Sequence, residues 1–460
     1  MIGNLHSERN VKIMITYPNQ PPKQPEKSIF KEGMQRTDSA LGLWMTHDPA
    51  IYKDPATNNY YIYCTGAICQ RSKDLVSWEM VGKVVDVPPV ESSEWVGGTD
   101  IWAPDIVKVG DEYRLYCSNS TWGVQQSCIF LAVADNAEGP FIPRGCVLKT
   151  SDKLPVNAID ANIITDVATG EMYMLYGSFW GGCHVLRLDK ETGLAAEEGI
   201  GTCVARRPMW MSGGIEGPYM IYNPDTEYYY LFVSYASLKS DYNVRVGRSK
   251  SPLGPFVDYN GRDLTDLNDA DNTIGFLNFC GYRWSEGTPY MAPGHNSVLH
   301  DTDGSWYIVA HIREKNFTDD PEPSTMQIRK IFWSPDGWPL VSAEPYSGEQ
   351  EQPITAEDIA GRYERINLVP SLPQGIQTAV PMKLRSDGYY ECCSVQGRWE
   401  YIGDNRIKIT YGPNTDICIV SAVWDHECNR PTLALTGLSD SGIGMWAKRL
   451  GDLQKKQVFK

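Results

Sequence analysis

Residues 47–66 read HDPAIYKDPATNNYYIYCTG: an acidic residue stands before a short apolar run, a turn and a second run rich in tyrosine. Aromatic and β-branched residues fill both runs and Asp-Pro separates them, which predicts a β-hairpin. The pattern returns four more times, led by Asp105, Asp160, Glu216 and His295. From Asp48 onward the leading residues lie 57, 55, 56 and 79 positions apart. A repeat of this length indicates a radially repeated or stacked architecture.

A second half-repeat follows most of the hairpins, as in SKDLVSWEMVGKVV at residues 72–85. Each repeat therefore predicts about four strands, the number found in one blade of a β-propeller. The five repeats predict a ring of five blades. The fourth interval is longer because it includes residues 263–293. We expect this insertion to form a loop or extra strands on one face of the ring, where loops commonly shape a binding cleft.

The tail of the chain changes character from about Pro353. Short alternating runs such as RIKITYG and PTLALTGL recur there between brief turns, which is typical of a small antiparallel barrel or sandwich. The predicted fold class is therefore all-β, a five-bladed β-propeller followed by a smaller antiparallel β-barrel or sandwich domain. We expect an N-terminal extension at 1–40, with VKIMITY at 11–17 as a candidate edge strand, the propeller at 41–350 and the C-terminal domain at 351–460.

The charge balance restricts the possible partners. The 42 Lys and Arg residues against 57 Asp and Glu give a formal net charge of −15 without a basic cluster, which excludes nucleic acid as a partner. No apolar stretch approaches the roughly 20 residues that span a bilayer, so no membrane association is expected. The first residues also lack the apolar core of a signal peptide, so we expect a cytoplasmic protein unless a leader has been removed from a secreted or periplasmic one.

The five leading residues should converge, because the innermost strand of each propeller blade lines the central axis. Several carboxylates around one water-accessible funnel repel one another, which raises the pKa of some and leaves others ionised. Glycoside hydrolysis needs one protonated and one ionised carboxyl group, since the protonated group donates its proton to the leaving oxygen while the carboxylate lies on the opposite side of the sugar. The pattern therefore favours a glycosidase over a non-catalytic sugar-binding or protein-interaction propeller.

Short motifs at all five leading residues resemble glycoside hydrolase family 43. They are His47-Asp48-Pro49, Trp102-Ala103-Pro104-Asp105, Asn157-Ala158-Ile159-Asp160, Gly214-Ile215-Glu216-Gly217-Pro218-Tyr219 and Gly294-His295-Asn296-Ser297. The second and fifth motifs, with the strand end Gly177-Ser178-Phe179-Trp180, make the likeness strongest to α-1,5-L-arabinanases, some of which carry an appended C-terminal β domain. The chain departs at Gly217 and Ala161, where many relatives carry Ala and Pro.

The resemblance implies an inverting glycosidase and gives roles to four of the leading residues. Asp48 matches the general base that activates water, and Glu216 matches the general acid that protonates the leaving oxygen. Asp160 matches a third acid, which keeps the pKa of the general acid raised and orients it. His295 matches an axial histidine beside a calcium or similar ion in the channel, and no organic cofactor is implied.

Sugar binding needs flat apolar faces edged by hydrogen-bonding groups. The candidates for stacking, with core packing as their alternative, are Trp102, Phe179 and Trp180. The candidates for contacts with sugar hydroxyls are Asp105, Asn162, Ser178 and Arg313, with structural support of the strand as the alternative for Asp105. No Asp-x-Asp-x-Asp-Gly calcium loop occurs, so an ion would be held mainly by water and His295.

The expected substrate is α-1,5-linked L-arabinan or arabino-oligosaccharides, cut either internally or from a chain end. A β-xylosidase or α-L-arabinofuranosidase of the same family, which removes single sugars from a pocket, is the enzymatic alternative. A lectin would be expected to lack one of the acids, whereas Asp48, Asp160 and Glu216 are all present.

Overall fold

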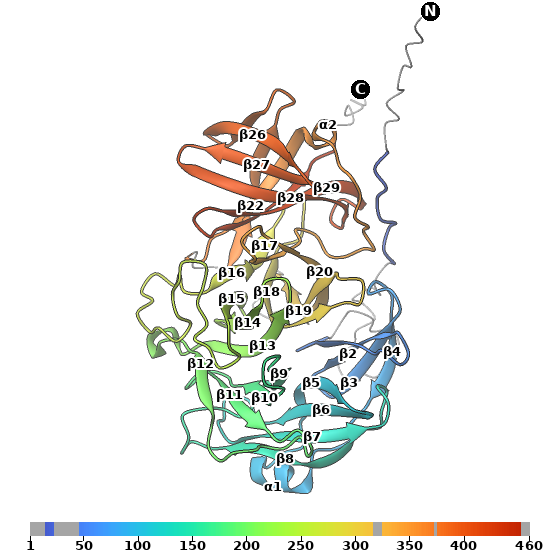
Figure 1. The fold of residues 1–460 in the computed structure, drawn as a ribbon, viewed down its shortest axis with the longest axis vertical. Helices are drawn as coiled ribbons and strands as arrows, with labels where there is room; N and C mark the ends of the chain where they lie inside the picture. The colour runs from blue at the N-terminus through green and yellow to red at the C-terminus, as the bar shows by residue number, and fades with distance from the viewer. Residues whose placement is uncertain (1–13, 23–45, 316–323, 372–374, 452–460) are drawn as a thin grey trace, which may run out of the picture.

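The computed structural model describes residues 14–22, 46–315, 324–371 and 375–451. Its strands form the five blades of a β-propeller, followed by a closed β-barrel (Figure 1). This confirms the predicted all-β class and decides for a barrel instead of a sandwich. Most of the predicted N-terminal extension lies outside the described residues, and its described part, 14–22, contains no strand.

The first four blades are antiparallel sheets of four strands each. The first contains β1 (Ala50–Lys53), β2 (Tyr60–Cys64), β3 (Ile68–Ser72) and β4 (Trp78–Lys83). The second contains β5 (Trp102–Val109), β6 (Glu112–Asn119), β7 (Ser127–Ala134) and β8 (Ile142–Thr150). The third contains β9 (Asn162–Thr165), β10 (Met172–Tyr176), β11 (Cys183–Leu188) and β12 (Thr202–Ala205). The fourth contains β13 (Ile215–Asn223), β14 (Tyr228–Tyr235), β15 (Asn243–Ser249) and β16 (Phe276–Phe279).

The fifth blade belongs to a larger sheet. Its strands are β18 (Tyr290–His300), β19 (Trp306–Glu314), β20 (Thr325–Trp333) and β21 (Pro339–Val341). Two short strands, β17 (Gly281–Arg283) and β23 (Ile376–Thr378), extend this sheet beyond β18. The insertion at 263–293 thus supplies the outer strand of the fourth blade and an extra strand of the next sheet.

The ring closes through its innermost strands and through apolar clusters between blades. β1, β5, β9, β13 and β18 contact one another in cyclic order, and β18 returns to β1. Successive side chains of a strand point to opposite faces. In β2, Tyr61 and Tyr63 therefore pack against the second blade, while Tyr60 and Ile62 pack against the fifth. Because both faces are covered, this strand reads as a continuous apolar run.

The C-terminal domain is a closed barrel of eight antiparallel strands. They are β22 (Gly361–Leu368), β24 (Val380–Leu384), β25 (Tyr389–Cys392), β26 (Val395–Gly403), β27 (Arg406–Tyr411), β28 (Asn414–Asp425), β29 (Arg430–Ser439) and β30 (Gly444–Arg449). β22 pairs with both β24 and β30, which closes the cylinder and leaves no free edge.

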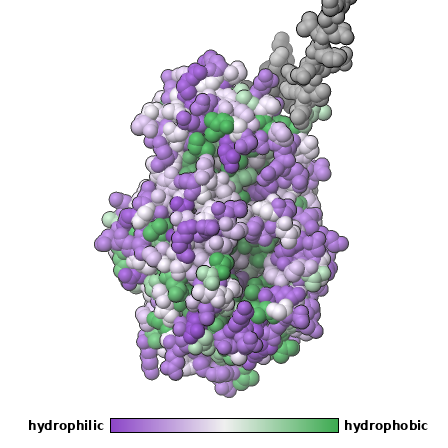
Figure 2. Space-filling view, viewed as in Figure 1, coloured by the Kyte–Doolittle hydropathy of each residue, from purple (hydrophilic) through white to green (hydrophobic). Residues whose placement is uncertain are grey.

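Helices are few and short in the described part of the chain. They are α1 (Val90–Val96), α2 (Ala356–Ile359) and the 3-10 turn η2 (Met209–Met211). None of these has the length and apolar character needed to cross a bilayer. Hydrophilic residues dominate the face shown in Figure 2, with small apolar patches between them, in keeping with the net charge of −15.

The two domains share an apolar core. One cluster continues from the last two blades into the barrel and includes Trp284, Trp338 and Trp446. The indole N–H of Trp446 donates a hydrogen bond to the Val341 carbonyl oxygen at 2.7 Å. The barrel strand β30 is therefore joined directly to the chain that leaves the fifth blade.

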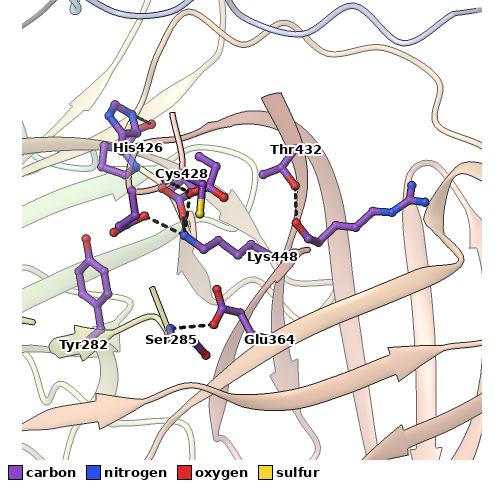
Figure 3. Close-up of polar contacts among 12 residues, drawn as sticks. Tyr282, Ser285, Glu364, His426, Cys428, Thr432 and Lys448 are labelled. Carbon is purple, nitrogen blue, oxygen red and sulfur yellow. Dashed lines mark hydrogen bonds and ion pairs between the residues drawn. The ribbon is translucent and has the colours of Figure 1, made fainter. Parts of the chain in front are cut away.

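A buried lysine adds a polar link at the same junction (Figure 3). The Lys448 Nζ atom lies 3.2, 2.9 and 2.7 Å from carboxylate oxygens of Glu344, Asp425 and Glu427. Glu344 follows β21 of the propeller, whereas the other three residues belong to the barrel. A buried charge is tolerated only when it is paired, so this cluster favours one orientation of the two domains.

Candidate active site

The structure brings the three predicted acids together at the starts of inner strands from different blades. Asp48 lies before β1, Asp160 lies before β9, and Glu216 is the second residue of β13. Burial, followed by the charges of Glu216 and Asp48, raises the pKa of Asp160 well above its ordinary value. The three carboxyl groups therefore act on one another within one site, as the repeat pattern predicted.

The backbone is unusual where these side chains enter the site. Asp48, Asp160 and His295 have φ angles of 53°, 64° and 46°. Residues other than glycine rarely adopt this left-handed region, and those that do cluster at functional sites. The strand register also shifts after Glu216 in β13 and around Gly294 in β18. Such bulges redirect side chains, here toward the centre of the ring.

Gly217 marks a close approach between two inner strands. Its φ angle is 54°, and a Cβ atom in its place would lie 3.0 Å from both Cα and Cγ of His295. The Gly217 N–H donates a hydrogen bond to Asp160 Oδ2 at 3.1 Å. The departure from the family pattern at this position therefore has a geometric reason, because glycine alone fits here without strain.

Asp48 is held as a carboxylate by three histidine rings. Its Oδ1 atom lies 3.1 Å from His295 Nδ1, 3.4 Å from His311 Nδ1 and 3.5 Å from His47 Nε2. Its Oδ2 atom accepts a hydrogen bond from the Thr65 hydroxyl. Burial opposes ionisation, but His295, His47 and His311 outweigh it and hold the pKa of Asp48 well below its ordinary value. Burial also lowers the pKa of all three rings.

Glu216 has the opposite electrostatic setting. Burial raises its pKa to about 7, while the Ser178 hydrogen bond and the nearby Tyr242 hydroxyl oppose the rise and the charge of Asp48 adds to it. The Ser178 hydroxyl donates to Glu216 Oε2 at 2.8 Å. Near neutral pH Glu216 keeps a proton that Asp48 has lost. Two carboxyl groups whose environments separate their pKa values in this way form an acid and base pair.

Asp105 and Asn162 face neighbouring blades instead of the shared site. Asp105 Oδ2 accepts hydrogen bonds from Asn162 Nδ2 at 3.1 Å and from the Ile163 N–H at 2.8 Å. Asn162 Oδ1 accepts a hydrogen bond from the Met220 N–H at 2.9 Å. These bonds join β5, β9 and β13, so the structure favours the supporting role for Asp105, and we reassign Asn162 from a sugar contact to a support of the ring. Burial raises the pKa of Asp105 to about 7.

The predicted aromatic platforms differ in exposure. Trp180 is 37% exposed, whereas Trp102 and Phe179 are half-buried. The segment that carries Trp102 adjoins the base, because the Ala103 N–H donates to the Thr65 hydroxyl at 3.0 Å and that hydroxyl donates to the Asp48 carboxylate. Trp180 therefore presents the most open apolar face of the three.

Two further predicted sugar contacts lie beside the acids. Ser178 is only 3% exposed and bonds to the Glu216 carboxyl, so we reassign it from sugar contact to positioning the acid. Arg313 lies in β19, and its Nε atom donates to the Leu238 carbonyl oxygen at 3.0 Å. Burial lowers the pKa of Arg313, and the charge of Asp48 opposes that shift. Arg313 therefore adds positive charge near the carboxylate of the base.

The sequence reasoning gave no role to four residues around the acids: His47, Thr65, Tyr242 and His311. The rings of His47 and His311 are stacked, with centroids 4.3 Å apart. His311 could have been found as a polar residue inside the apolar run of β19, and His47 belongs to the first motif. Thr65 and Tyr242 carry no comparable signal, because only the folded ring brings them to the acids.

A cavity of about 570 Å³ lies between the ends of the third and fourth blades and the segment that follows β22. Phe179 and Gly214, which lie close in sequence to Ser178 and Glu216, form part of its propeller wall. The segment after β22 contributes Pro370 to the facing wall. The barrel domain therefore forms one wall of this cavity, which Asp48, Asp160 and Glu216 do not line.

The side chains around Asp48 include groups that could bind a metal ion. Asp48, His47 and His311 offer ligand atoms that all lie within 4.8 Å of one another. Calcium prefers about six to eight oxygen ligands, whereas a set of two imidazoles and one carboxylate suits zinc-like ions. These residues do not fit calcium as direct ligands. A water-coordinated ion beside His295 stays a prediction, and we derive no step of the reaction through it.

Family models match nearly the whole described chain. The model described as glycosyl hydrolases family 43 matches residues 44–339. The model described as a C-terminal lipocalin-like domain matches residues 343–447. The two matches correspond to the propeller and the barrel.

Similar proteins and structures agree with these matches. The chain is 32% identical to an extracellular endo-α-(1→5)-L-arabinanase of Thermotoga petrophila, over 88% of this chain and 94% of that protein. It is 29% identical to extracellular endo-α-(1→5)-L-arabinanase 2 of Bacillus subtilis, over 95% and 97%. A crystal structure of endo-1,5-α-L-arabinanase from Thermotoga petrophila superimposes with a TM-score of 0.81 at 28% identity, over 90% of this chain and 100% of that one.

Proposed function

The chain belongs to glycosyl hydrolase family 43, and we propose that it hydrolyses α-1,5-linked L-arabinan with inversion at the anomeric carbon. It is a glycosidase of the arabinanase type. The observation that carries the mechanism is the pairing of an ionised Asp48 with a protonated Glu216 in one buried site. The named activity of the two bacterial relatives supports arabinan as the substrate.

Asp48 is proposed as the general base. The histidines around it keep it ionised in a buried place, where a carboxylate would otherwise bind a proton. In an inverting reaction this carboxylate takes a proton from the water that attacks the anomeric carbon. The Thr65 hydroxyl and the His295 ring fix the carboxylate so that its orientation is set before substrate binds.

Glu216 is proposed as the general acid. With a pKa of about 7 it carries a proton at mildly acidic and neutral pH and donates it to the leaving glycosidic oxygen. Asp160 supports this role through Gly217, whose N–H it binds, and through its charge whenever it is ionised. The pKa of Asp160 is itself raised well above its ordinary value, first by burial and then by the charges of Glu216 and Asp48.

An internal mode of cleavage is proposed for the polymer. Trp180 lies two residues after Ser178, which bonds to Glu216, and its exposed ring offers a surface for a sugar unit beyond the scissile bond. The names of the two relatives describe endo-acting enzymes, which favours internal cleavage here as well.

The test is hydrolysis of debranched arabinan, followed by product separation and by NMR of the newly formed anomeric centre. We expect a rapid loss of viscosity, oligosaccharide products and initial release of the inverted anomer. Release of arabinose alone from nitrophenyl pentosides, without attack on arabinan, would contradict the arabinanase assignment and favour the arabinofuranosidase or xylosidase alternative. A retained anomeric configuration would refute the water-activating role of Asp48.

The location of the protein is proposed to be extracellular. Both named relatives are extracellular enzymes, and their polymeric substrate class supports action outside the cell. This proposal replaces the cytoplasmic expectation. Immunodetection of the protein in washed cells and in culture medium of the native host would test it.

A further inference from the structure

One buried tyrosine beside the acids has no part in the reaction described so far. Tyr242 lies just before β15 and is only 1% exposed. Its ring lies directly on Gly294, where an added Cβ atom would approach the ring to 2.3 Å. The ring of His311 lies 5.7 Å away between centroids. These contacts hold the phenol in one orientation and explain the glycine in the fifth motif.

The Tyr242 hydroxyl faces the general acid. Ser234 on β14 pairs with Glu216 on β13 and with Val244 on β15. Tyr242 lies two residues before Val244, so its side chain points to the same face of the sheet as Ser234 and Glu216. After burial, the charge of Glu216 has the largest effect in raising the pKa of Tyr242, followed by the charges of Asp160 and Asp48. The phenol therefore interacts electrostatically with all three acids, and its interaction with Glu216 is the strongest.

This hydroxyl is left without a well-formed hydrogen bond among the described residues, although it is fully enclosed. A buried hydroxyl without a partner is unfavourable for folding, so its retention needs an explanation. Catalytic hydrogen bonds are often long or misaligned before substrate binds and tighten during the reaction. During the reaction Glu216 loses its proton and becomes a carboxylate. This carboxylate can then accept a hydrogen bond from the Tyr242 hydroxyl.

We propose that Tyr242 is a positioning residue, which holds Glu216 and donates a hydrogen bond to its carboxylate once the proton has passed to the glycosidic oxygen. This inference rests on the proposed function. In that step the bond between the anomeric carbon and the leaving oxygen breaks, and the leaving oxygen gains the Glu216 proton. Water bonds to the anomeric carbon and gives its proton to Asp48. Tyr242 keeps its own proton throughout.

The test is the isosteric variant Tyr242→Phe in the full chain, measured on linear arabinan across pH. Because the hydroxyl stabilises ionised Glu216, its loss should move the alkaline limb of the kcat profile upward by about one pH unit. We expect kcat at the optimum to fall roughly tenfold with little change in KM, since the bond forms after substrate is bound. The Tm should not fall, because the deleted hydroxyl had no well-formed hydrogen bond.

A substrate with a better leaving group separates positioning from general damage. A 2,4-dinitrophenyl arabino-oligosaccharide needs little protonation of its leaving oxygen, so the tenfold deficit should nearly disappear on it. The matched control is Tyr116→Phe, which deletes a buried phenol hydroxyl that donates to the Gly193 carbonyl oxygen at 2.9 Å. Tyr116 lies on β6, and its hydroxyl is bonded to the loop at Gly193 and not to Asp48, Asp160 or Glu216, so its variant should leave the pH profile unchanged.

The outcomes distinguish this inference from the proposed function. An unmoved alkaline limb in Tyr242→Phe, or an equal loss of rate on both substrates, would overturn the role of Tyr242. Retention of activity by Glu216→Ala, measured in parallel, would instead overturn the assignment of the general acid. A wild-type protein inactive on arabinan would refute the proposed function itself.

Discussion

Replacing Glu216 by glutamine should make the protein inactive but more stable above neutral pH. The pKa of Glu216 is raised by burial from 4.5 to about 7 in the folded protein. The unfolded chain therefore releases this proton first as pH rises, and the free energy of unfolding falls between about pH 4.5 and pH 7. At about 1.4 kcal/mol per pH unit, the loss reaches roughly 3 kcal/mol above pH 7.

Glutamine keeps nearly the same volume and can still accept the Ser178 hydrogen bond, but it has no proton to lose. The Tm of Glu216→Gln should match that of the wild type near pH 4.5. It should exceed the wild-type value by roughly 3 to 6 °C at pH 8, given the size of the propeller. Thermal unfolding followed by circular dichroism at both pH values measures this difference.

The control for this experiment is Glu94→Gln, which removes the same charge from an exposed position on α1. Its Tm difference from the wild type should not grow between the two pH values. An equal Tm difference for Glu216→Gln at pH 4.5 and pH 8 would mean that Glu216 is not held neutral in the folded state.

Four other changes test separate parts of the account. Asp48→Ala should lower kcat at least about 100-fold, the lower end of a general-base contribution; near-normal turnover would remove it from the mechanism. Gly217→Ala should lower kcat roughly tenfold, because strain at φ 54° and the contact with His295 displace Glu216; unchanged kinetics would contradict that contact. Lys448→Met should lower the free energy of unfolding by about 3 kcal/mol or more, since Glu344, Asp425 and Glu427 lose their partner; an unchanged Tm would disprove the link. EDTA should lower activity, and calcium should restore it, if an ion lies beside His295; activity indifferent to both refutes the ion.

Sequence periodicity was enough to predict the ring because each blade repeats the same local sequence pattern of strands and turns. Alternating aromatic and β-branched runs, separated by turn residues, predict strands wherever they occur. Asp48, Asp160 and Glu216 occupy equivalent places in their repeats, so a circular arrangement brings them together without any further information. The closed form of the C-terminal barrel was not predictable, since barrel and sandwich use the same alternating strands and differ only in whether β22 meets β30.

The assignments of Asp105 and Asn162 show the limit of this reasoning. A repeat position predicts that a side chain lies near the axis, but not whether it faces the substrate or the next blade. Bulges and left-handed residues decide that direction. At the second blade the register shift turns Asp105 toward β9, where backbone and amide donors occupy its carboxylate.

By itself, the sequence determined the fold class, the number of blades and the three acids, because these depend on local patterns repeated along the chain. Only the tertiary structure decided the protonation state of each acid and the residues that surround it. Asp48 meets His311 from a strand more than 260 positions away, and Glu216 meets Tyr242 across its own blade. A pKa depends on burial and on neighbouring charges in space, and no spacing in the chain records either quantity.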